Sequence, residues 1–126
     1  RNCSTMHHAA RTYGAVAKQT ANPRELEADL LLDAAARLQA VRDGWESRSA
    51  ELDAALTNNR KLWSIFLSSA TNSENPLPPN LRQNIANLGI YIFNETLSIQ
   101  CNPRPDALAP LIRINREIAA GLLGRG

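Results

Sequence analysis

Apolar residues recur every three or four positions along most of this 126-residue chain, and Pro and Gly divide it into segments. This spacing places the apolar side chains on one face of an α-helix, whereas a half-buried strand would alternate apolar and polar residues. Short connections favour antiparallel neighbours. The sequence therefore predicts an all-α, single-domain bundle of about five helices. These are expected at residues 6–19, 22–44, 47–70, 80–100 and 106–124.

Residues at the ends of these segments support the predicted boundaries. Asn22 is a favourable N-cap, a Pro follows it, and Glu25 completes a capping-box spacing. Asp106 can cap the last helix in the same way. Gly44 should end or kink the second helix, with Trp45 packed beneath the corner. Residues before position 6 are expected to be added or disordered, so that the domain covers 6–126.

The apolar stripes of these helices should form the core. The stripe of the second helix comprises Leu26, Leu30, Ala34, Leu38 and Val41. In the fourth helix, residues 88–93 are apolar on every side, which is typical of a central helix or of one that offers a face to a partner. A strand is the alternative for these six residues, because Ile, Tyr and Phe favour sheets. The helical period on both sides favours a helix.

Asparagines interrupt these stripes at positions where burial is expected. They are Asn59, Asn84, Asn87 and Asn115. A buried amide costs stability unless its donors and acceptor are paired. The pattern predicts either a polar network between helices or amides that are available to a partner backbone.

Charge and cysteine usage narrow the class of protein. Fourteen basic and twelve acidic side chains give a net charge of +2 and are interleaved rather than gathered in a basic stripe. Cys3 and Cys101 lie far apart without metal-ligand spacing, and no run of 18 apolar residues could span a membrane. We therefore expect a cytoplasmic protein with reduced thiols that is not attached to a membrane.

No set of residues indicates catalysis. His7 and His8 are adjacent, so they point to different sides of a helix and cannot share a metal as an i, i+4 pair could. Cys101 has no histidine nearby in the sequence and is expected to be a small packing residue. Gly-rich phosphate loops and zinc spacings are absent from the sequence. We expect no enzymatic activity, no cofactor and no metal site.

Five motifs give the chain a family resemblance. They are YGAVA at 13–17, NPRELE at 22–27, NRKLWSIF at 59–66, LPPNLRQNIANLGI at 77–90 and LIRINREIAAGL at 111–122. Together and in this order, they resemble the FlaF family of flagellar biosynthesis regulators of alphaproteobacteria. The resemblance covers nearly the whole chain after Met6. It implies a non-enzymatic cytosolic factor for flagellin production and export, similar to a flagellin-binding chaperone that works beside the companion regulator FlbT.

A helical bundle could cover the terminal amphipathic segments of flagellin by helix-in-groove docking. Large apolar side chains are the expected anchors, because such residues dominate binding hot spots. The candidate anchors are Leu62, Trp63, Phe66, Ile90, Tyr91 and Phe93, and the candidate polar rim is Arg60, Lys61 and Arg82.

Two alternatives remain open. Trp63 and Phe66 could instead be core residues. The protein could also control flagellin translation, either through FlbT or by binding RNA through its arginine-rich end. That end comprises Arg104, Arg113, Arg116 and Arg125.

Overall fold

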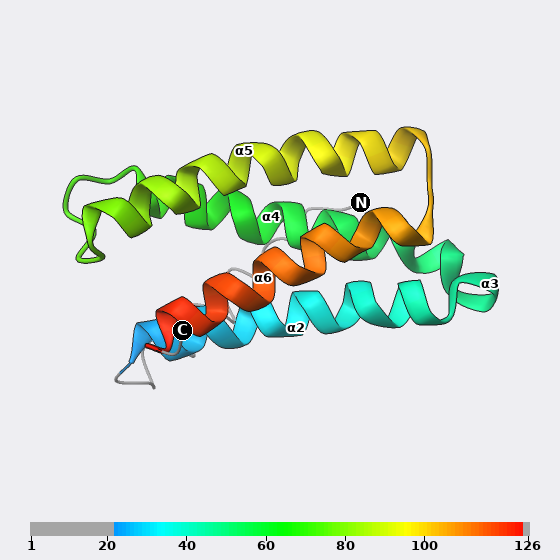
Figure 1. Cartoon of the computed structure of the whole chain (residues 1–126), viewed down its shortest axis with the longest axis horizontal. Helices are drawn as coiled ribbons and strands as arrows, with labels where there is room; N and C mark the ends of the chain where they lie inside the picture. Colours follow the sequence, from blue (N-terminus) through cyan, green and yellow to red (C-terminus); the bar gives the residue numbers. More distant parts are fainter. Residues whose placement is uncertain (1–21, 125–126) are drawn as a thin grey trace, which may run out of the picture.

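Four long helices make up most of the structure, a computed structural model that describes residues 22–124 (Figure 1). They are α2 (Pro23–Asp43), α4 (Leu52–Ala70), α5 (Pro79–Cys101) and α6 (Ala109–Leu122). Consecutive long helices run in opposite directions, and residues 22–124 contain no strand. The predicted all-α bundle is confirmed, including a helix rather than a strand at residues 88–93. The helix predicted at 6–19 lies outside the described residues.

The start of α2 has the predicted cap. The Asn22 side chain accepts hydrogen bonds from the backbone N–H groups of Arg24 and Glu25, at 3.1 and 3.3 Å. Asn22 also donates from its side-chain amide to the Glu25 carboxylate at 3.2 Å, which closes the capping box between side chains. The cap therefore satisfies two N–H groups that the helix leaves without an internal partner.

Two other helix starts differ from the prediction. The continuous helix expected from residue 47 is interrupted: α3 (Trp45–Arg48) and a 3₁₀ turn, η1 (Ser49–Glu51), precede α4. The chain must reverse direction between α2 and α4, and these short turns make that reversal. Trp45 packs against the core at this corner, as expected. Asp106 does not cap α6, because it lies within a second 3₁₀ turn, η2 (Pro105–Leu108), that leads directly into the helix.

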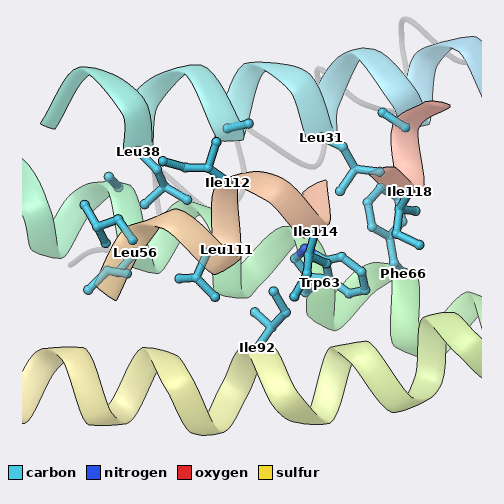
Figure 2. Close-up of a cluster of buried hydrophobic side chains, with 14 of the residues drawn as sticks. Leu31, Leu38, Leu56, Trp63, Phe66, Ile92, Leu111, Ile112, Ile114 and Ile118 are labelled. Carbon is cyan, nitrogen blue, oxygen red and sulfur yellow. The ribbon is translucent and has the colours of Figure 1, made fainter. Parts of the chain in front are cut away.

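The core lies between two antiparallel pairs, α2 with α6 and α4 with α5, which are joined by packing of α2 on α4 (Figure 1). Figure 2 shows Ile92 projecting from α5 into a cluster with Leu111 and Trp63. Contact between α5 and α6 is slight, so α5 is held chiefly by α4. One side of α5 faces the core, and much of its remaining circumference is free of the other described helices.

The face that α2 buries is rotated from the predicted one. Leu26 and Leu30 are half-buried, whereas Ala28 and Leu31 are fully buried. The complete buried set is Ala28, Leu31, Ala34, Ala35, Leu38 and Val41. Half of these residues are alanines, and small side chains allow the α2 and α6 backbones to approach closely. This explains why the sequence stripe of larger residues did not identify the buried face.

Glu27 lies at the edge of a small cavity where α2, α4, α5 and α6 meet. The cavity has a volume of about 20 Å³, room for one water at most, and its lining includes Phe66, Ser69 and Ile85. Burial raises the pKa of the Glu27 carboxyl, and the nearby Arg24 guanidinium partly opposes this effect. The folded protein therefore binds a proton at Glu27 more tightly than the unfolded chain does.

The Glu27→Gln variant should be more stable than the parent at pH 7, because an uncharged amide avoids the cost of burying a carboxylate. Since the folded pKa is raised, the parent loses stability as the pH rises from the ordinary value of 4.5 through the folded pKa. The difference in free energy of unfolding between the variant and the parent should accordingly grow over this range and shrink toward pH 4. Urea unfolding of both proteins at several pH values measures this difference. A difference that does not change with pH would contradict the raised pKa of Glu27.

Candidate partner-binding surface

Asn115 is the centre of a buried hydrogen-bond network that joins three helices. Its Oδ1 accepts from the Trp63 Nε1–H at 2.8 Å, and its Nδ2 donates to the Leu31 carbonyl at 3.2 Å and to Asn59 Oδ1 at 2.7 Å. Asn59, Trp63 and Asn115 are all completely buried. Because the indole N–H of Trp63 can only donate, the orientations of the Asn115 and Asn59 amides are fixed. The network therefore links α6 to both α2 and α4 in one register.

One donor of this network has no partner. Asn59 Nδ2 is buried and makes no hydrogen bond among residues 22–124. An unpaired buried donor costs about 1–3 kcal/mol, which offsets part of what the network contributes. Asn59 thus serves mainly as an acceptor that orients the Asn115 amide.

The other two predicted network members lie elsewhere. Asn84 and Asn87 are exposed on α5, and Asn87 accepts a hydrogen bond from Gln83, one turn earlier, at 3.0 Å. The prediction was wrong for Asn84 and Asn87 because α5 packs on the other helices through a narrow face. Only Asn59 and Asn115, on helices with neighbours on two sides, reach the interior.

The structure also corrects two candidate surface anchors. Trp63 is fully buried and Phe66 is 7% exposed. Their rings meet edge to face, with centroids 6.0 Å apart and an interplanar angle of 88°. Both rings belong to the central cluster in Figure 2. They are core residues, the alternative that the sequence left open, and a partner cannot reach them in the closed bundle.

The main exposed apolar surface lies on α5, along a line that we call the α5 stripe. It comprises Ala86, Ile90, Phe93 and Leu97, which follow one another at intervals of three or four residues. Ile90 is 56% exposed and Leu97 is 60% exposed, whereas Phe93 is half-buried and packs against the core. At 100° per residue, Ile90 and Leu97 differ by only about 20° around the helix. They therefore form one continuous apolar ridge.

The α5 stripe adjoins the face that packs on α4. Gly89 marks that face, since a Cβ there would lie 3.6 Å from the Leu67 Cβ and 3.7 Å from the Trp63 ring. Phe93 lies about 40° from Gly89 around the helix, which places it between the packed face and the exposed ridge. Phe93 thus connects a surface that a partner could touch to the α4–α5 contact.

The remaining candidate anchors do not share this ridge. Tyr91 is 39% exposed but lies about 100° around α5 from Ile90. Leu62 is on α4, half-buried and packed on the core. A single docked helix could therefore contact Ile90 and Phe93 together, but it would not reach Tyr91 in the same way.

The three candidate rim residues have different environments. Arg60 is exposed and lies within about 20° of Leu67 around α4, on the side that faces α5. Lys61 is half-buried on the same helix. Arg82 is engaged elsewhere: its Nη1 donates to the Asn72 carbonyl at 3.2 Å and so fixes the α4–α5 loop. Of the three, Arg60 is the best placed to border the α5 stripe.

Sequence reasoning missed Leu97, the most exposed large apolar residue among those described. The signal was present, because Leu97 follows Ile90 by seven residues and Phe93 by four, the spacing of one helix face. It was overlooked because the apolar run at 88–93 drew the candidate site to consecutive residues, which spread around a helix.

The side chains and helices of residues 22–124 also bear on the expectations about metals, thiols and membranes. No group of three or more His, Cys, Asp or Glu residues in this range could hold a metal ion. Cys101 was expected to be a packing residue, but it is exposed at the end of α5. None of the helices in this range is both long enough and apolar enough to cross a bilayer.

The arginines of the candidate RNA site are separated in the structure. Arg113 and Arg116 line a groove between α6 and α2, where Arg42 joins them. Arg104 precedes η2, in the connection between α5 and α6, and is not part of this groove. Arg125 lies outside the described residues.

Comparison with known proteins places the chain in a family. The family model described as "Flagellar protein FlaF" matches residues 9–122, which is nearly the whole chain. No curated protein and no solved structure matches the chain.

Asn115→Ala should lower the free energy of unfolding by about 3 kcal/mol or more, because the Trp63 N–H and the Asn59 Oδ1 are left without a partner in the interior. Asn59→Ala should cost less, about 1–2 kcal/mol, since it also removes the unpaired Nδ2 and leaves Asn115 bonded to Leu31. Denaturant unfolding of both variants measures the difference. Equal losses would mean that Asn115 is not the centre of the network.

Proposed function

This chain belongs to the FlaF family of flagellar proteins, and from that premise we propose that it is a non-enzymatic cytoplasmic factor that binds flagellin. The proposed contact is the α5 stripe, which would receive an amphipathic helix from a terminal segment of flagellin. Such binding would shield the apolar face of the flagellin segment before export. The observation that carries the proposal is the pair of residues Ile90 and Leu97, each more than half exposed on one ridge.

The physical case rests on the cost of leaving this ridge in water. Burying apolar surface is favourable by about 25 cal/mol per Å², so two large aliphatic side chains covered by a partner could contribute several kcal/mol before the costs of association. Aliphatic residues at i and i+7, with Phe93 between them, lie on one helix face, which is the spacing at which two helices pack their apolar sides together.

The border of the α5 stripe suits a helical client. Asn94 and Gln83 lie about 40° and 20° from Ile90 around the helix, so they flank the ridge on its outer side. Both are uncharged, so a docking helix would meet amides rather than a fixed charge along that edge. Arg60 on α4 supplies a positive charge on the other side. This arrangement favours a client with an apolar face and an acidic margin.

The combined variant Ile90→Ser/Leu97→Ser should weaken flagellin binding about tenfold to a hundredfold, because both ridge anchors lose most of their apolar surface. Its fold should be little affected, since both side chains are largely exposed. Co-expression with each flagellin of the same bacterium, followed by gel filtration and titration of the purified complex, measures the loss.

The matched control is Leu32→Ser/Ile65→Ser, which removes two exposed aliphatic side chains from α2 and α4, at 38% and 47% exposure. This control should retain flagellin binding. Equal weakening by both pairs would show that general surface apolarity, not the α5 stripe, holds the client. If the parent co-elutes with the companion regulator FlbT and with no flagellin, the proposal is wrong.

A further inference from the structure

We propose that the groove between α2 and α6 is a second binding site, which takes an acidic segment of a protein partner. The groove is a shallow depression of about 420 Å³ on the surface, away from the α5 stripe. Its α6 side carries Arg113 and Arg116, and its α2 side carries Arg42. Because it lies on a different pair of helices, the proposal does not rest on flagellin binding by α5.

The three arginines of this α2–α6 groove are available for an external carboxylate. All three are exposed, and none forms an ion pair within the described chain, where the two ion pairs are Arg37 with Asp33 and Arg48 with Glu51. Arg116 makes only a long contact, 3.5 Å, from its Nη2 to the Gln39 Oε1 across the groove. Guanidinium groups bind carboxylates through paired N–H donors, so three of them around one depression form a receptor for acidic side chains.

The floor of the groove indicates a polypeptide. Ala109, Ile112 and Ala120 also line it; the two alanines are half-buried and Ile112 is almost fully buried. The small side chains of the two alanines allow close approach of a partner backbone or of short apolar side chains. An acidic, amphipathic segment would satisfy both features, with carboxylates on the arginines and apolar groups on the floor.

The charge pattern disfavours nucleic acid at this place. Glu117 also lines the groove, next to Arg113 and Arg116, and would repel a phosphate backbone that follows the same path. A peptide can place its few carboxylates opposite the arginines and an uncharged residue opposite Glu117. Three arginines and one glutamate give the groove a small positive charge, which a peptide with a few carboxylates can match.

The test uses a fluorescein-labelled helical peptide of about 16 residues with Glu and Leu at helical spacing. A matched peptide with Gln in place of Glu and a single-stranded oligouridylate RNA serve as the comparison ligands. Fluorescence anisotropy with the full chain should show saturable binding of the Glu peptide that is tighter than binding of the Gln peptide and of the RNA. Arg113→Glu/Arg116→Glu should weaken it by about tenfold or more.

The matched control is Arg24→Glu/Arg48→Glu, which makes the same change of charge at exposed positions outside the groove. It should change the affinity for the Glu peptide less than about twofold at physiological salt. Equal weakening by both double variants would show that net charge alone attracts the peptide and would overturn the proposal. Equal binding of the Glu and Gln peptides, or tighter binding of the RNA, would overturn it as well.

Discussion

The hydrogen bonds of Asn115 set the arrangement of this bundle. They connect α6 to the Trp63 ring and the Asn59 amide of α4, and to a backbone carbonyl of α2. Apolar packing alone tolerates small shifts of one helix along another, whereas an amide with fixed donors and an acceptor fits in one register. The close α2–α6 pair and the position of Trp63 against α5 both depend on that register.

The position of α5 follows from this arrangement and explains the proposed function. Because the network holds α2, α4 and α6 together, α5 is needed only to close one side of the core, through Ile85, Ile92 and Ile99. Its outer ridge remains in water although it is apolar. An exposed apolar ridge on a rigid support is the feature that a partner helix can use without any opening of the bundle.

The helices could be predicted from sequence because period and caps are local signals, and Asn22 performs the expected role. The division of apolar residues between core and surface could not be predicted, because it depends on which sides of a helix have neighbours. Trp63 and Ile90 both lie in apolar segments, yet Trp63 is fully buried and Ile90 is more than half exposed. The buried asparagines were separable from the exposed ones only in three dimensions. The basic groove depends on Arg42, about 70 residues from its α6 partners in the sequence.

If this protein binds its partner by the outer ridge of α5, the core stays closed, and hydrogen exchange at the Trp63 indole N–H reports this directly. Trp45, half-buried at the α2–α4 corner, gives the second indole signal in the spectrum and serves as the internal reference. Exchange at Trp63 should be slower than at Trp45 by about a thousandfold or more, and should remain so when flagellin is bound. Exchange as fast as that of Trp45, or loss of protection on adding flagellin, would contradict the account, because Trp63 would then be exposed when the partner binds.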